Sequence, residues 1–358
     1  MQRLPFVVVT NSHISHVYEL YYKAFETLRR VDEIKTVEDN DRYCNIISTT
    51  LSEHLTVIPR LAMGVIECQD MMAAEQLDKF MNTLLRSRIS RRVIAEQHLA
   101  LTETFNSPWH FPDATHQQDP NLDSVGEVFL RCNAREVVTE CGETARSLTK
   151  AAYDSSCSLP NIVLEGHLEA TFPYILTHLQ YIIGEILRNS IQAVVEHHSG
   201  TNSILPPVEV LICEAPQHVI IRISDKGGGI PKDILPDLWS FGKSPRSQTH
   251  LKNLLKVPKM AATMQEIQPT IDTRLDKPTS ASSTSKRLSD TSLASLTSRP
   301  PNLRLGIGLP MSRVYAEYWA GSLEIHSLEN YGCDAFLQIS KLGNKNEQLS
   351  TRASMDAV

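Results

Sequence analysis

The sequence EILRNSIQA occupies residues 185–193, within a stretch from Leu176 to Glu196 whose apolar residues recur at helical spacing. In a helix, Glu185 and Asn189 project from one face about a turn apart. A carboxylate in that position can act as a base, and a carboxamide oxygen can bind Mg²⁺. The same pair also occurs on ordinary solvated helix faces, so this motif alone does not indicate a function.

Three glycine-containing motifs follow it along the chain. DKGGGIP, at residues 225–231, comes directly after a β-rich run; its glycines allow a ligand to approach the backbone, and Asp225 can accept a hydrogen bond from an exocyclic amine. GIGLP, at 306–310, opens a helical pattern, and the N–H groups of a helix N-terminus attract phosphate. GCD, at 332–334, leads into the last β-rich run. Each motif alone can arise by chance, but all four in this order are much harder to explain by chance.

The chain divides into a helical first half and a mixed second half. Up to about residue 150, apolar residues recur at three- and four-residue spacing, which predicts an antiparallel bundle of about four helices. An irregular stretch at 155–160 is typical of a linker. Beyond it, short β-rich runs alternate with helical patterns, which predicts an α+β domain with one mixed sheet covered by helices. These runs are residues 162–164, 208–213, 219–224, 323–326 and 335–339.

A segment from residue 243 to 304 interrupts the second half. It contains SASSTSKRLSDTSLASLTSRPP, which has too little apolar surface to order itself. A structureless loop of this length counts against a domain assignment unless the loop has a function. We therefore interpret it as a mobile lid.

Composition excludes several classes of protein. The 358 residues carry 35 Lys+Arg and 41 Asp+Glu, and this length predicts about two domains. No apolar run is long enough for a membrane span, and the net charge of -6 gives no general attraction to nucleic acid. The seven cysteines are scattered without a C-x-x-C pair, which disfavours a disulfide framework or a zinc ribbon. The N-terminal residues contain no recognisable targeting segment.

The four motifs resemble the N, G1, G2 and G3 boxes of the ATP-binding fold shared by gyrase, the ninety-kilodalton heat-shock chaperone, the histidine kinases and MutL. More narrowly, residues from about 15 to 343 resemble the mitochondrial 2-oxoacid dehydrogenase kinases, the pyruvate and branched-chain enzymes. The narrower resemblance also rests on IPRLAMGV at 58–65, SRISRR at 87–92 leading to Gln97-His98, GH and FPY between 166 and 174, and LPMSRVYA at 309–316.

The resemblance implies an α+β protein of two domains. Residues 1–150 would form an N-terminal helical bundle for regulation and for docking on the lipoyl domain of an E2 core. Residues 160–343 would form a histidine-kinase-like α/β sandwich that binds ATP, with the lid at 243–304 and a flexible tail at 344–358.

The resemblance also implies roles for site residues. Glu185 would be the general base for a substrate serine, Asn189 would hold Mg²⁺, and Asp225 would meet the adenine amino group. His98 would lie beside Glu185 and tune its basicity, although packing or phosphate acceptance are alternative roles. The remaining predicted ATP-binding residues are Arg188, Gln192, Gly227, Gly229, Ser244, Gly306, Ile307, Gly308, Leu309 and Cys333.

Several positions depart from the family pattern. Arg188 replaces a Lys, Gln192 replaces a common Arg, and Cys333 replaces a Thr near adenine. Arg304 stands where the first glycine of the G2 box is expected, and Pro245 follows Ser244 where a Thr is usual. None of these changes removes the base or the metal ligand.

The sequence therefore predicts an ATP- and Mg²⁺-dependent protein serine kinase that phosphorylates and inactivates the E1 α subunit of the pyruvate dehydrogenase complex. A branched-chain 2-oxoacid dehydrogenase kinase, a low-activity regulatory partner and a phosphohistidine kinase are the alternatives. The family implies a homodimer in the mitochondrial matrix, and we expect neither nucleic acid nor a membrane span. The motifs of P-loop enzymes and eukaryotic protein kinases are absent from the sequence.

Overall fold

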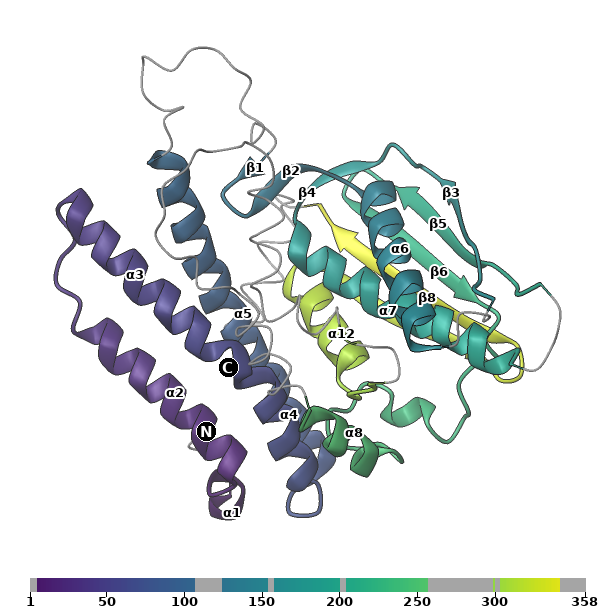
Figure 1. Cartoon of the computed structure of the whole chain (residues 1–358), viewed down its shortest axis with the longest axis horizontal. Helices are drawn as coiled ribbons and strands as arrows, with labels where there is room; N and C mark the ends of the chain where they lie inside the picture. The colour runs from purple at the N-terminus through teal and green to yellow at the C-terminus, as the bar shows by residue number, and fades with distance from the viewer. Residues whose placement is uncertain are drawn as a thin grey trace, which may run out of the picture.

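The computed structural model describes residues 5–106, 124–153, 158–199, 204–256, 299 and 303–341. A helical region made from the N-terminal part of the chain lies beside a sheet domain (Figure 1). Most of the predicted lid, part of the predicted linker and the predicted tail lie outside the described residues.

The helical region consists of long helices with clear starting signals. They are α1 (Phe6–Val9), α2 (Ser12–Arg29), α3 (Val37–Glu53), η1 (His54–Thr56), α4 (Val57–Glu67) and α5 (Ala74–Phe105). Asn11 caps α2 through its side-chain oxygen, and Thr36 and Asp39 form a capping box on α3. The apolar helix α4 is buried along nearly its whole length because α2 and α8 (Ser247–Leu254) pack against it.

One part of the first half is not helical, contrary to the prediction. β1 (Ser124–Val125) and β2 (Val128–Asn133) form a small sheet with β4 (Thr171–Ile175) of the second half. The next helix, α6 (Ala134–Ala152), packs against α7 (Leu176–His197). Periodicity predicted helical structure up to about residue 150, which agrees with α6, but it could not identify α7 as the partner because the choice of partner depends on tertiary packing. Strand pairing thus joins residues on both sides of the predicted division at 150.

The main sheet has five strands in the order β3-β5-β6-β8-β7. They are β3 (Ile162–Gly166), β5 (Val208–Glu214), β6 (His218–Asp225), β7 (Ser322–Leu328) and β8 (Gly332–Ser340). β3 and β5 run parallel and the other neighbours run antiparallel, so the predicted mixed α+β sheet is confirmed. Side chains of β6 alternate between buried and half-buried, as a strand covered on one face requires.

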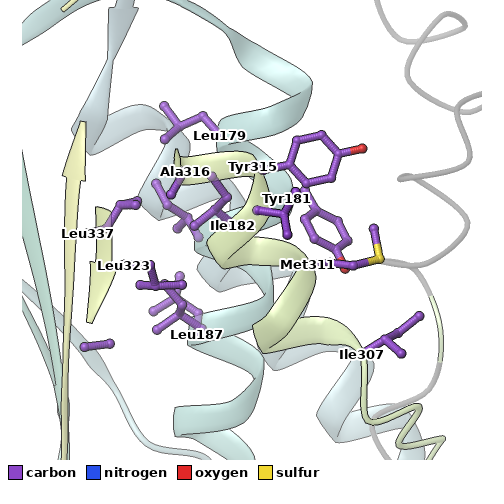
Figure 2. Packing of buried hydrophobic residues seen from close by; sticks show 14 of the residues in the cluster. Leu179, Tyr181, Ile182, Leu187, Ile307, Met311, Tyr315, Ala316, Leu323 and Leu337 are labelled. Atoms are coloured by element: carbon purple, nitrogen blue, oxygen red, sulfur yellow. The ribbon is translucent and has the colours of Figure 1, made fainter. Parts of the chain in front are cut away.

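Helices α7 and α12 (Gly308–Tyr318) cover the sheet, and their facing side chains form much of the core (Figure 2). Tyr181 of α7 meets Met311 and Tyr315 of α12 in this layer. The same apolar cluster continues into the helical region through α4 and α5. Polar contacts reinforce this junction: Arg86 Nη2 lies 2.7 Å from Glu317 Oε2, and the Phe241 N–H donates to Asp78 Oδ1 at 2.8 Å.

Two further expectations concern the cysteines and membrane-spanning helices. The described cysteines are all free thiols. Within the described ranges, no helix combines the length and the apolar character that crossing a membrane requires.

Candidate nucleotide-binding site

Helix α7 carries the first motif through the centre of the sheet domain. Nearly all its middle residues are buried, including Glu185 and Arg188, whereas Asn189 is exposed. The two members of the i, i+4 pair therefore differ sharply in environment. The accessible amide of Asn189 suits an ion that arrives with its water shell, because Mg²⁺ retains several waters.

Glu185 is held by two arginines. Its Oε1 and Oε2 accept hydrogen bonds from Arg299 Nη1 and Nη2, each at 2.9 Å, and Arg188 Nη2 lies 3.6 Å from Oε1. The Glu185 side chain is only 1% exposed and that of Arg299 is 8% exposed. Burial alone would raise the pKa of Glu185, but Arg299 and Arg188 together hold it below its ordinary value. Arg299 thus holds one lone pair of each oxygen and lowers the basicity of Glu185.

The start of α12 lies directly against this carboxylate. A side chain at position 308 would collide with Glu185 Oε2, so any residue larger than glycine would force the carboxylate to move. Gly306 has a φ of +75°, and a side chain there would collide with the ring of His250. Ile307 and Leu309 complete this first turn, Ile307 being buried and Leu309 half-buried. The first N–H groups of a helix lack intrahelical partners and favour anions, so this turn can hold phosphate next to Glu185.

Asp225 joins the glycine-rich turn to its surroundings. Its Oδ1 accepts from the N–H of Gly227 at 2.9 Å and of Cys333 at 3.4 Å, and the Ser190 hydroxyl donates to the same side chain. Burial raises the pKa of Asp225, and these hydrogen bonds offset only part of that effect. Asp225 therefore connects β6, β8 and α7, and the boxes that carry these residues are brought together.

Gly227 and Gly229 make the backbone of this turn. A side chain at Gly227 would collide with Ala193 of α7, and Gly229 has a φ of +73°. Beside it, Cys333 Sγ lies 3.5 Å from Ser327 Oγ, and burial raises the pKa of the thiol. The turn is thus fixed tightly against α7 and β7.

Gln192 is buried one turn beyond Asn189. Its Nε2 donates to Glu196 Oε1 at 3.1 Å and to the Tyr153 hydroxyl at 3.4 Å. Gln192 therefore contacts Glu196 of α7 and Tyr153, the residue that follows α6.

His98 is not brought to Glu185. Its Nε2 lies 3.1 Å from Asn40 Oδ1, and its ring packs edge-on against Tyr43 at a centroid distance of 5.3 Å. Both partners belong to α3, so His98 lies on the face of α5 that packs against α3. Within the described part of the chain, no hydrogen bond joins His98 to Glu185, so the structure gives no direct contact for the predicted tuning.

Ser244 also has a separate environment. Its hydroxyl accepts from the Arg246 N–H at 3.2 Å and so shapes the turn before α8. It lines a groove with Asp70 and with residues of the 233–248 stretch. The groove lies between the α4–α5 connection and the beginning of the predicted lid.

Two arginines at the site were not predicted to belong to it. Arg299 lies in the Ser- and Thr-rich segment, where nothing in the sequence identifies its partner. Arg304 was noticed only as a replacement for glycine, yet its Nη2 pairs with Glu196 Oε1 on α7. The arginines therefore connect the stretch before α12 to two points on α7.

Comparisons with known proteins agree with this arrangement. Residues 1–129 match the family described as "Mitochondrial branched-chain alpha-ketoacid dehydrogenase kinase", and residues 175–342 match "Histidine kinase-, DNA gyrase B-, and HSP90-like ATPase". A pyruvate dehydrogenase (acetyl-transferring) kinase 2 of Saccharomyces cerevisiae is 33% identical, over 98% of this chain and 74% of its own length. The chain belongs to the mitochondrial pyruvate dehydrogenase kinase family. The Arabidopsis thaliana kinase is 28% identical over 98% of this chain and 81% of its own. The human pyruvate dehydrogenase (acetyl-transferring) kinase isozyme 4 is 26% identical over 96% of this chain and 72% of its own length.

Membership in this kinase family confirms the resemblance that the four boxes indicated. The second half is an ATP-binding domain of the histidine kinase and gyrase type, so nucleotide is its substrate class. Glu185, Gly308 and Asn189 lie within that matched range, as does the ion pair between Glu185 and Arg299.

Proposed function

We propose that this chain is an ATP- and Mg²⁺-dependent protein serine kinase that phosphorylates and inactivates the E1 α subunit of the pyruvate dehydrogenase complex. The observation that carries the proposal is the close approach of Gly308 to Glu185. Phosphoryl transfer to a hydroxyl needs the phosphate and the proton acceptor side by side. The relatives that match nearly the whole chain are named as kinases of pyruvate dehydrogenase, which supports this substrate.

Each part of the site has a defined task in this reaction. The N–H groups of the turn from Gly306 to Leu309 would hold phosphate oxygens, and Asp225 would accept a hydrogen bond from the adenine amino group. Asn189 would contribute an oxygen ligand to Mg²⁺. When bound, Mg²⁺ supplies positive charge that offsets the charge of the phosphates.

Glu185 would receive the proton of the substrate serine. The serine oxygen forms a bond to the γ-phosphorus while the bond from that phosphorus to the β,γ-bridging oxygen breaks, and ADP leaves. Arg299 holds both oxygens of Glu185, so release of one of them would raise the basicity of the carboxylate toward the serine proton. The freed guanidinium would then lie close to the transferred group, where its charge favours the transition state.

We further propose that the protein acts in the mitochondrial matrix as a homodimer docked on an E2 lipoyl domain. His98 would act on Glu185 only indirectly, through the packing of α5. The family match over residues 1–129 is named for the branched-chain enzyme, so branched-chain E1 is the second candidate substrate.

The test supplies γ-labelled ATP and Mg²⁺ to the purified chain, with pyruvate or branched-chain E1 and the matching E2 core in separate reactions. Acid-stable label on the pyruvate E1 α subunit is the expected result. Label only on branched-chain E1 would identify that subunit, and not the pyruvate E1 α subunit, as the substrate. Acid-labile label on the chain itself would favour a phosphohistidine kinase. Tight ATP binding with no transfer to either E1 would favour a regulatory partner.

A further inference from the structure

Arg304 has a fixed backbone and an accessible side chain. Its carbonyl oxygen accepts from Asn253 Nδ2 at 2.8 Å, and its neighbours Leu303 and Leu305 are buried. The side chain of Arg304, by contrast, is 35% exposed. Arg304 stands two residues before Gly306, so its side chain begins close to the adjoining phosphate turn.

The partner of Arg304 is held in place independently. Glu196 Oε1 accepts from Gln192 Nε2 and from the Tyr153 hydroxyl, each at 3.1 Å, in addition to Arg304. Glu196 is 44% exposed, so the ion pair is screened by water and contributes little free energy. Glu196 would keep two partners if Arg304 moved away. Exchange of this carboxylate for another anion therefore costs little.

Several other cations around the phosphate turn are already engaged in ion pairs. Arg188 and Arg299 are buried against Glu185, and Arg313 pairs with Glu317 at 2.8 Å. Burial, together with Arg246 and Arg304, lowers the pKa of His250, which leaves that ring neutral near neutral pH. A nucleotide triphosphate brings more negative charge than one divalent ion cancels. Arg304 differs from the buried arginines because its partner, Glu196, is exposed to solvent.

We propose that Arg304 binds the phosphate groups of the nucleotide, and that Glu196 competes with the nucleotide for the same guanidinium. This inference rests on the proposed nucleotide site. The planar guanidinium suits phosphate oxygens, with which it forms two parallel charge-assisted hydrogen bonds. Arg304, which replaces a glycine of the G2 box, thus adds charge to a turn that otherwise binds phosphate through its backbone.

The test measures binding of Mg·ATP, Mg·ADP and adenosine by calorimetry to the full chain and to three variants. Arg304→Ala should weaken Mg·ATP binding about tenfold, weaken Mg·ADP binding less, and leave adenosine unchanged. Arg304→Lys should recover part of the loss because it restores the charge without the fork. Glu196→Gln should tighten Mg·ATP binding, since the competing carboxylate is gone.

The outcomes separate this inference from the proposed function. If wild-type protein binds no Mg·ATP, the proposed function and the inference both fail. If wild-type protein binds Mg·ATP but Arg304→Ala binds it equally well, only the inference fails. An equal loss for adenosine and ATP would indicate a structural role for Arg304 and would also overturn the inference.

Discussion

Two glutamates of α7 form ion pairs with arginines that precede α12, one pair buried and the other exposed. Glu185 pairs with Arg299 where the side chains are 1% and 8% exposed, whereas Glu196 pairs with Arg304 where they are 44% and 35% exposed. A buried pair costs much to separate because one partner is left as an uncompensated charge, while an exposed pair contributes little. We propose that the buried pair controls the chemistry at Glu185 and that the exposed pair adjusts the binding of nucleotide.

Replacement of Arg299 should have the largest effect on stability. Arg299→Ala removes both close donors of Glu185 and should lower the free energy of unfolding by about 3 kcal/mol. Arg299→Lys should lose less, since it keeps the charge. Urea denaturation measures the difference, and Arg29→Ala is the control because Arg29 is 61% exposed and pairs with Glu26. The control should lose under about 1 kcal/mol of unfolding free energy. Similar losses for Arg299→Ala and Arg29→Ala would mean that burial does not make the Glu185–Arg299 pair more important for stability than the exposed Glu26–Arg29 pair.

A methyl group at Gly308 should disturb the buried pair from the other side. Gly308→Ala places carbon against Glu185 Oε2, which cannot move without leaving Arg299, so a loss of about 2 kcal/mol is expected. Gly184→Ala is the matched control, because Gly184 lies in α7 with open space around it. This control should stabilise the helix by up to about 1 kcal/mol. Thermal unfolding of both variants should therefore shift in opposite directions, and a shift of Gly308→Ala to higher temperature would contradict the predicted collision.

The buried pair should also make stability depend on pH. The pKa of Glu185 is lower in the folded chain than its ordinary value, because Arg299 and Arg188 outweigh the effect of burial. This contribution is complete above the unfolded pKa and is lost as pH falls through the folded pKa. The difference in unfolding free energy between wild type and Arg299→Ala should accordingly narrow as the solution is acidified through this window. A difference that stays constant would show that Glu185 and Arg299 do not titrate as a pair.

The exposed pair should give the smallest effect on stability. Glu196→Gln should change the free energy of unfolding by less than about 1 kcal/mol. Chemical denaturation of this variant beside Arg299→Ala provides the direct contrast. A large loss for Glu196→Gln would mean that this carboxylate supports the fold through Gln192 and Tyr153.

Much of the second half could be predicted from sequence because local signals agree there. The β-rich runs at 208–213 and 219–224 and the helix around Glu185 follow from side-chain periodicity, and glycines mark the turns between them. The pairing of β2 with β4 could not be predicted, because α6 and β3 separate the two strands along the chain. Local patterns contain no information on which distant strand completes such a sheet.

The motif residues of the site could be predicted from the sequence, but their long-range partners could not. Asp225, Gly227 and Gly308 lie in motifs whose family resemblance implies a common nucleotide site, and the structure brings them to α7. The pairing of Arg299 with Glu185 joins residues that are 114 positions apart and leaves no mark in the local sequence. His98 was assigned through resemblance, and the helical face on which it lies depends on how α5 packs against α3.

The role of Glu185 as the base is the central claim, and phosphoryl transfer by Glu185→Gln tests it most directly. The measurement compares transfer to the pyruvate E1 α subunit with Mg·ATP affinity, alongside Glu143→Gln on the exposed face of α6. We predict that Glu185→Gln still binds Mg·ATP but transfers phosphate at least about 100-fold more slowly, while the control behaves as wild type. Full transfer activity in Glu185→Gln would contradict the account.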